Sequence, residues 1–143
     1  MVSENERQDQ MQKTVYEINY LRAQGSELQK QIYSVQALLE ENAEATKALS
    51  ALSQSKGSET LVPLGAGVFA RATLANSDLV LIDVGARASV EKSASEAKAV
   101  LSERRKKLEQ LFNELRVSLD SLATHLQELN EQASDLSAGG QGA

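Results

Sequence analysis

Apolar residues recur at alternating spacings of three and four positions along the first third of the chain. A heptad repeat has two positions, a and d, that face the partner helix. In this segment they are occupied by Met11, Thr14, Ile18, Leu21, Gly25, Leu28, Ile32, Val35, Leu39, Asn42, Thr46 and Leu49. Most of these residues are apolar, whereas the positions between them are mainly Gln, Glu, Ser, Lys and Arg. Because this spacing is that of a coiled-coil seam, the pattern predicts a helix over residues 4–56. Gly57 is placed to end that helix in the left-handed conformation.

The same periodicity returns in the last third of the chain. Leucine occupies every seventh position at Leu101, Leu108, Leu115, Leu122, Leu129 and Leu136, and the companion inward positions are Arg105, Phe112, Leu119, Leu126 and Ala133. Ser93 and Glu96 have the spacing of a capping box. The pattern therefore predicts a helix over residues 93–136 and a disordered Gly-rich tail over 137–143. Arg105 is a charge in a seam position, where it either snorkels to solvent or sets the register.

Between the two helical patterns, residues 58–92 alternate with a period of two and are divided by Gly- and Asn-containing turns. The expected strands are Thr60–Leu64, Val68–Ala75, Leu79–Val84 and Arg87–Glu91, with turns at 65–67, 76–78 and 85–86. Pro63 suits an edge strand because it has no N–H to donate. Four strands in two hairpins bury too little surface to be stable alone, so this segment is expected to need partners.

These elements predict a chain that is mainly α with a small β part. Antiparallel pairing of the two helices buries both apolar stripes within one chain. The result is a long coiled-coil hairpin joined by two β-hairpins, in a single domain spanning residues 1–143. The chain has few aromatic residues and no Trp, which suits long helices better than a globule.

Composition narrows the classes of function. The net charge of -5 gives no basic surplus of the kind that nucleic-acid binding requires. The absence of cysteine excludes disulfides and thiol catalysis. The polar start of the chain does not resemble a signal peptide, and no apolar run reaches the roughly 18 residues of a membrane span. We therefore expect a soluble, cytoplasmic protein.

Sequence motifs that suggest catalysis or cofactor binding fit structural roles better. Residues 65–70 match G-x-G-x-x-A, but a dinucleotide fingerprint needs a following helix and the pattern here alternates instead. The basic run 104–107 is expected to pair with Glu103 and Glu109 on a solvated helix face. One histidine, His125, cannot supply a metal site, and the carboxylates at 40, 41 and 44 have no pocket to shift their pKa values. We expect no enzyme activity, metal or cofactor.

The linker carries a resemblance to a known family. Residues 57–69, GSETLVPLGAGVF, are similar to the first-hairpin motif of alpha-type prefoldin subunits. Residues 84–92, VGARASVEK, resemble the second hairpin, where the family often reads G-x-G and this chain has Arg87 in place of the second Gly. Beta-type subunits have one hairpin, so two hairpins favour the alpha type. The order of helix, β segment and helix matches over the whole chain.

The resemblance implies a molecular chaperone of the archaeal type. Such prefoldins are hetero-hexamers of two alpha and four beta subunits, whose hairpins form an oligomeric β-barrel from which the coiled coils extend. The tips of the coiled coils bind unfolded polypeptides and pass them to a group II chaperonin without nucleotide. The expected activity is that of an ATP-independent holdase.

Two sets of site residues are expected on this basis. Terminal helical turns open at low cost and many weak contacts add up in an oligomer, so seam residues near the chain ends are the expected client contacts: Met11, Val15, Ile18, Leu126, Leu129 and Leu136. Strand edges invite strand addition by a neighbour, so the expected oligomer interface is formed by Leu61, Val62, Leu64, Val68, Phe69, Leu79, Val80, Leu81, Ile82 and Val84.

Two other functions use the same patterns. A structural coiled-coil protein, homo-oligomeric or filament-forming and of the prefoldin type, would need the same heptads and strand edges. A coiled-coil arm of a nucleic-acid machine is disfavoured by the acidic balance of the chain.

Overall fold

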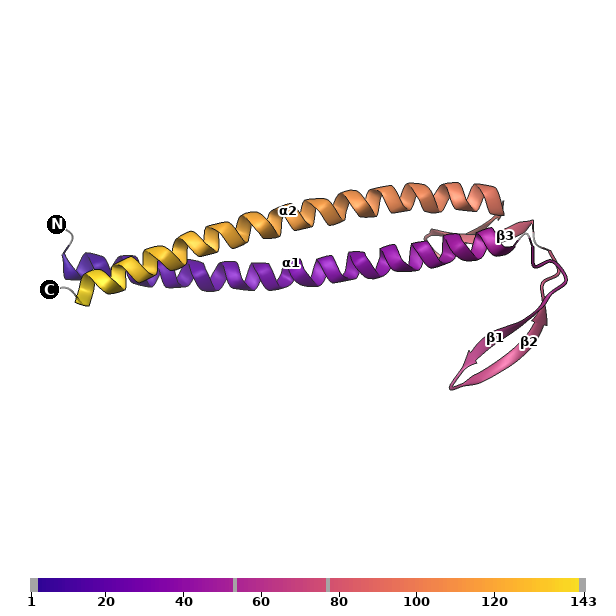
Figure 1. Cartoon of the computed structure of the whole chain (residues 1–143), viewed down its shortest axis with the longest axis horizontal. Coiled ribbons are helices and arrows are strands. Elements are labelled where there is room, and N and C mark those ends of the chain that lie inside the picture. Colours follow the sequence, from indigo (N-terminus) through magenta and orange to yellow (C-terminus); the bar gives the residue numbers. More distant parts are fainter. Residues whose placement is uncertain (1–2, 53, 77, 142–143) are drawn as a thin grey trace. The chain divides into compact units, whose positions relative to one another are not determined.

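The computed structural model describes residues 3–52, 54–76 and 78–141. Its elements are two helices and four strands (Figure 1), in the order α1 Glu4–Leu52, β1 Glu59–Gly65, β2 Val68–Thr73, β3 Leu79–Gly85, β4 Ala88–Ser93 and α2 Ala94–Gln141. The predicted fold class, mainly α with two small β-hairpins, is confirmed. Ser53, Ser77 and Gly142–Ala143, which the predicted helix, turn and tail include, lie outside the described residues.

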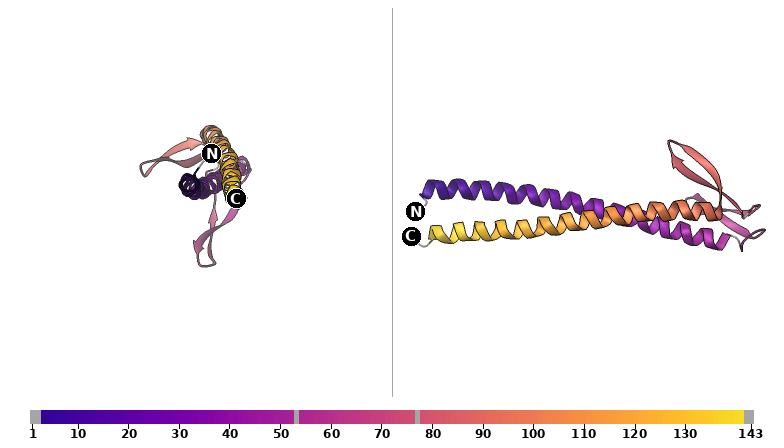
Figure 2. Two further views of the ribbon diagram at one scale, coloured as in Figure 1. Left: turned by 90° about the vertical axis from the view of Figure 1, so that its left-hand side faces the viewer. Right: turned by 90° about the horizontal axis from the view of Figure 1, so that it is seen from above.

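The chain divides into two compact units, which are described separately. Residues 1–37 and 110–143 form one of them, here called the arm unit, and residues 38–109 form the other, the hairpin unit. The arm unit contains the first part of α1 and the last part of α2, whereas the hairpin unit contains the rest of both helices and all four strands. The ends of the two helices that are nearest the chain termini lie side by side in the arm unit (Figures 1 and 2).

Burial along α1 follows the predicted seam position by position. Each of the twelve predicted inward residues is buried or half-buried, and nearly every other residue of the helix is exposed. Gly25 allows a close approach, since a Cβ placed there would lie 3.3 Å from Cδ2 of Leu122. The helix begins in a capping box that the sequence analysis missed. Ser3 Oγ accepts from the N–H of Glu6, and Ser3 N–H donates to the Glu6 carboxylate.

Helix α2 begins as the sequence predicts and ends later than it predicts. Ser93 Oγ accepts a hydrogen bond of 3.1 Å from the N–H of Glu96, which confirms the expected cap. The seam residues from Leu101 to Leu136 are buried or half-buried except Arg105, whose side chain is 51% exposed and lies 3.6 Å from Glu109. Arg105 therefore reaches solvent instead of entering the seam.

The predicted boundaries at both helix C-termini need correction. The tail from 137 was expected to be disordered, but α2 continues to Gln141, where pairing with α1 supports it: Arg7 Nη1 donates to the carbonyl of Gly139 at 3.0 Å. Helix α1 ends at Leu52 instead of residue 56. The N–H groups of Gln54 and Ser55 donate to the carbonyls of residues three positions earlier, as in a 3₁₀ turn, so the α-helical pattern stops before Gly57. Gly57 has a φ of 78°.

The four strands form two separate two-stranded antiparallel sheets, β1–β2 and β3–β4. In the first sheet Leu61 lies opposite Arg71 and Pro63 opposite Phe69, and in the second Leu81 lies opposite Glu91. The strands agree with the predicted ones to within two residues. Strand β4 begins at Ala88, one residue later than predicted, because Arg87 belongs to the turn.

The hairpin unit has a small apolar core of its own. Ile82 of β3 is 8% exposed and Ala97 of α2 is 1% exposed, and both line an apolar groove of about 320 Å³ together with Leu49 and Leu52 of α1. The two helices are also tied here by a polar contact, because Asn42 Nδ2 donates to the carbonyl of Leu101 at 3.0 Å. The side-chain amide of Asn42 is thus buried in the seam with a hydrogen-bond partner. Because another register would remove that partner, Asn42 favours this register of the helix pair.

The two hairpin turns share one geometry although their sequences differ. Ala66 and Gly67 have φ values of 51° and 78°, and Ala86 and Arg87 have values of 51° and 60°. Two successive positive φ angles match the right-handed twist of the strands. Arg87 therefore keeps the turn that Gly makes at the equivalent place in the first hairpin, at the steric cost of a Cβ in the left-handed region.

Replacing Arg87 with Gly should therefore stabilise the chain by about 1 kcal/mol, because the turn conformation no longer strains a side chain. The measurement is thermal unfolding followed by circular dichroism. Gly67→Arg in the first hairpin is the matched control and should shift the transition to lower temperature. An unchanged transition for Arg87→Gly would mean that the arginine side chain makes a stabilising contact that offsets the strain.

Candidate interaction surfaces

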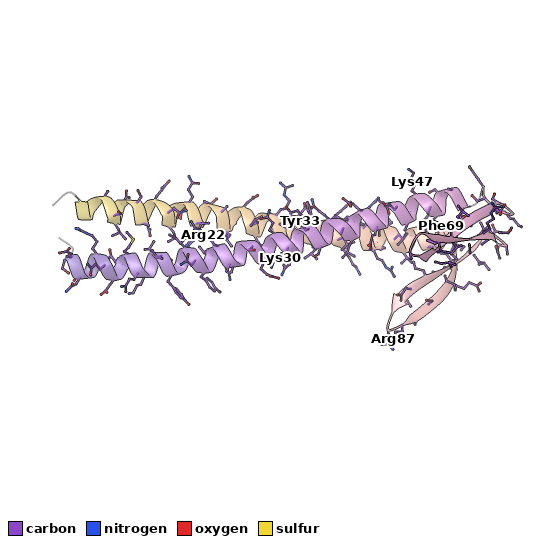
Figure 3. All side chains as sticks on the ribbon, turned by 90° about the horizontal axis from the view of Figure 1, so that it is seen from below. Arg22, Lys30, Tyr33, Lys47, Phe69 and Arg87 are labelled. Carbon is purple, nitrogen blue, oxygen red and sulfur yellow. The ribbon has the colours of Figure 1, made fainter. Side chains whose placement is uncertain are left out.

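Large apolar side chains are exposed in both units of the chain. In the arm unit they are Val15, Tyr16, Tyr20, Tyr33, Leu111 and Val117. In the hairpin unit they are Leu38, Leu61, Val62, Leu64, Val68, Phe69, Leu79, Leu81, Val84 and Val90. Figure 3 labels two of them, Tyr33 of α1 and Phe69 of β2. Where exposed apolar residues of this kind adjoin one another, they form candidate surfaces for binding other macromolecules.

The six residues expected to contact clients lie mostly in the seam of the arm unit. Ile18 and Leu129 are buried, and Met11, Leu126 and Leu136 are half-buried. Val15 is the one exposed member of the six. The others are wholly or partly covered, because each helix covers the seam of the other. Their role in client binding stays a prediction.

The sequence analysis missed two exposed tyrosines beside Val15. Tyr16 is 73% exposed and Tyr20, one helical turn later, is 56% exposed. Tyr20 is oriented by Gln24, whose Nε2 lies 2.9 Å from the tyrosine hydroxyl. Tyr16 and Tyr20 lie four residues apart and so share one face of α1, which is here called the tyrosine patch. The heptad pattern contained the signal, because both tyrosines fall outside the seam positions where apolar residues are normally covered.

The ten residues expected at the oligomer interface divide into two classes. Val80 is half-buried and Ile82 is buried within the chain itself, where they line the groove beside α1 and α2. The other eight are exposed, and Leu81 is exposed most, at 74%. Strand β3 therefore turns Ile82 toward its own helices and Leu81 away from them. Only the second class is free to contact another chain.

Charged residues of the hairpin unit form local pairs. Lys106 lies 3.5 Å from Glu103 and Arg105 lies 3.6 Å from Glu109, which confirms the expected pairing of the basic run. Arg104 donates to the backbone carbonyl of Asp83 in β3. The two exposed ion pairs contribute little to stability. The hydrogen bond from Arg104 to Asp83 links α2 to the second hairpin.

Neither a metal centre nor a membrane-spanning helix is found in the described part of the chain. Among residues 3–52, 54–76 and 78–141, no three His, Cys, Asp or Glu side chains gather closely enough to bind a metal ion. Within the same ranges, neither helix combines the length and hydrophobicity needed to cross a bilayer.

Comparison with known proteins identifies the family. A model of the family described as prefoldin subunit matches residues 21–139. Prefoldin subunit alpha of Methanobrevibacter smithii is 30% identical over 96% of this chain and 94% of its own length. The alpha subunit of Methanosarcina barkeri is 32% identical over 79% of this chain and 81% of its own.

The chain belongs to the prefoldin family. This result confirms the resemblance that the linker residues indicated. A solved structure described as filamentous PFD from Methanocaldococcus jannaschii has the same fold, with a TM-score of 0.52 at 22% identity, over 86% of this chain and 97% of that one. The prefoldin family is a family of chaperones and not of enzymes.

Seam residues and patch residues of this prefoldin subunit should respond differently to substitution. Ile18→Ala removes buried methyl groups and should lower the free energy of unfolding by about 2 kcal/mol. Tyr16→Ser should change it by less than about 0.5 kcal/mol, because Tyr16 is exposed and Ser and Tyr have similar helix propensities. Denaturant unfolding followed by circular dichroism measures both. Equal losses would show that Tyr16 is packed.

Proposed function

We propose that this chain is the alpha subunit of a prefoldin that acts as an ATP-independent holdase. In this proposal two copies assemble with four beta subunits in the cytoplasm, bind unfolded polypeptides and pass them to a group II chaperonin. The observation that carries the proposal is the combination of two β-hairpins with exposed apolar residues and a match to alpha subunits over nearly the whole chain. A polypeptide held by exposed side chains needs no nucleotide hydrolysis.

Assembly through the hairpins is supported by their lack of an internal core. A two-stranded sheet covers neither of its faces, and strand β1 is exposed at every residue. Leu61, Leu64 and Phe69 would therefore stay in contact with water in an isolated subunit. Burial of such residues against a neighbour is favourable, at roughly 25 cal/mol per Å² of apolar surface. The hairpins are thus the part of the chain that gains most from assembly.

Client binding by the arm unit is supported by the tyrosine patch. Tyr16 and Tyr20 offer large amphipathic surfaces that lose little conformational entropy on contact. Unfolded polypeptides expose apolar side chains without a fixed geometry, so contacts with a small patch are weak. An assembly presents several such patches at once, and the resulting effective concentration gives useful avidity. Seam residues such as Met11 and Leu136 add to this surface when the terminal turns open.

A homo-oligomeric, filament-forming protein is the second candidate. The exposed hairpins suit self-assembly as well as assembly with beta subunits, and the similar solved structure is described as filamentous. Native mass spectrometry after co-expression with beta subunits of the same genome separates the two. A complex of two alpha and four beta subunits supports the hexamer, and a ladder of alpha-only oligomers supports the filament.

Client protection should depend on the tyrosine patch. The double variant Tyr16→Ser, Tyr20→Ser should weaken suppression of aggregation of a denatured test protein, measured by light scattering without nucleotide. Tyr33→Ser is the matched control, because Tyr33 is a similarly exposed tyrosine of the same helix, 13 residues beyond Tyr20. An equal loss for Tyr33→Ser would place client contacts along the whole outer face of α1, and a strict requirement for ATP would contradict the holdase.

Assembly should depend on the exposed side of β3. Leu81→Asp should leave the isolated chain folded, since Leu81 is 74% exposed there, but should prevent complex formation because burial would desolvate an unpaired carboxylate. Ile82→Asp is less informative, because Ile82 is already buried in the chain and its replacement disrupts the hairpin unit itself.

Val117→Asp provides the control for Leu81→Asp. Val117 is a similarly exposed apolar residue of α2 in the arm unit, so this variant should assemble normally. Circular dichroism of each isolated variant and native mass spectrometry of each complex are the measurements. Normal complexes with Leu81→Asp would exclude this face of β3 from the interface.

A further inference from the structure

The C-terminal end of α2 is built from residues that favour a helix poorly. Residues 137–141 read SAGGQ, and glycine disfavours a helix more than any residue except proline. The last four carbonyls of a helix have no partner within it, and a nearby cation stabilises them. The last turn of α2 contains no basic residue. This helix end therefore depends on a donor from outside the helix.

Arg7 of α1 supplies both the donor and the positive charge. Its Nη1 donates to the carbonyl of Gly139, one of the last four carbonyls of α2, at 3.0 Å. The guanidinium also lies against the glycine itself, because a Cβ added at Gly139 would be 3.8 Å from Cζ and 3.9 Å from Nε of Arg7. The two helix ends run side by side in the arm unit (Figures 1 and 2). Arg7 thus caps the C-terminus of the other helix.

The seam and the capping box of α1 both position Arg7. It lies seven residues before Thr14, so it occupies the next inward position toward the N-terminus. Arg7 is half-buried, whereas the three residues after it are exposed. The capping box of Ser3 and Glu6 orders the turn before it, and the Arg7 N–H donates to the Ser3 carbonyl at 3.0 Å. A charged side chain that is partly buried needs a polar partner, and the Gly139 carbonyl is such a partner.

The seam beside this contact buries little apolar surface. Of the three inward positions of α1 nearest the N-terminus, Arg7, Met11 and Thr14, only Met11 is apolar, and it is half-buried. A groove of about 500 Å³ is lined here by Leu136 of α2 together with polar residues of both helices. Because apolar burial holds the helices weakly at this place, the hydrogen bond from Arg7 makes up a large part of what keeps them paired.

We propose that Arg7 is a latch that closes the coiled coil at the end nearest the chain termini, so that the last turns of α2 and the first turns of α1 open together. Opening uncovers Met11 and Leu136 for an unfolded polypeptide, and this second part rests on the proposed holdase function. Only the open form presents these two seam residues fully. The apparent affinity that they contribute therefore rises with the fraction of chains that are open.

Two substitutions move the latch in opposite directions. Arg7→Ala removes the donor and should speed amide hydrogen exchange at residues 136–141 about fivefold. Gly139→Ala fits at ordinary contact distance, keeps the carbonyl and favours the helix, so it should slow exchange there about fivefold. The decisive amides are those of residues 8–11 in α1. A latch requires that Gly139→Ala slow them too, although the substitution lies in α2, and unchanged exchange at residues 8–11 would overturn the latch.

Arg22→Ala is the control for the loss of charge. Arg22 is an exposed arginine of α1 in the same arm unit (Figure 3). Its removal changes the net charge as Arg7→Ala does, but it should leave exchange at residues 8–11 and 136–141 unchanged. Equal acceleration by both variants would show that charge alone sets the opening, and it would overturn the role of the bond to Gly139.

Client access is measured by fluorescence anisotropy of a labelled polypeptide that is kept unfolded by reduction and alkylation of its cysteines. The full chain with Arg7→Ala should bind it about threefold more tightly than the unsubstituted chain, and Gly139→Ala about threefold more weakly. Equal affinities would overturn the uncovering of a client site. Absence of binding by the unsubstituted chain would contradict the proposed holdase, whereas exchange at residues 8–11 would still decide the latch.

Discussion

Neither helix of this chain is able to bury its apolar residues alone, because these residues form a stripe along one narrow side. The stripes of α1 and α2 cover each other, and most remaining positions of both helices are polar. Pairing therefore brings residues far apart in the sequence together, as with Gly25 and Leu122 in the arm unit and Asn42 and Leu101 in the hairpin unit. The cost of ordering such long helices is offset by burial that is shared between them.

Because the apolar residues of the two helices face each other, few of them are left to cover the hairpins. One side of β3 is buried against the helices through Ile82, whereas β1 is exposed along its whole length. The two hairpins thus differ in how much of them the chain itself stabilises. A subunit built in this way is folded in its helices and incomplete in its strands, which suits a member of an oligomeric chaperone family.

The same principle separates seam residues from exposed aromatic residues in the arm unit. Seam residues such as Ile18 are occupied in holding the helices together, so they are poorly placed to bind a client while the pair is intact. Tyr16 and Tyr20 have no such structural duty, because they lie outside the seam. Exposure of a large apolar side chain to water is unfavourable. An exposed residue of this kind is therefore a better candidate for binding than a seam residue that the partner helix already covers.

The sequence by itself determined the helices, their seam, the two hairpins and the family. Each of these depends on local periodicity or on turn residues such as Gly65 and Gly67, so the information lies within a few neighbouring positions. Tertiary structure decided which apolar residues are free. It buried Ile82 but not Leu81, and it extended α2 past residue 136 against Arg7. It also brought the guanidinium of Arg104 in α2 within hydrogen-bonding distance of the backbone carbonyl of Asp83 in β3. These outcomes depend on contacts between segments distant in the chain, which periodicity does not encode.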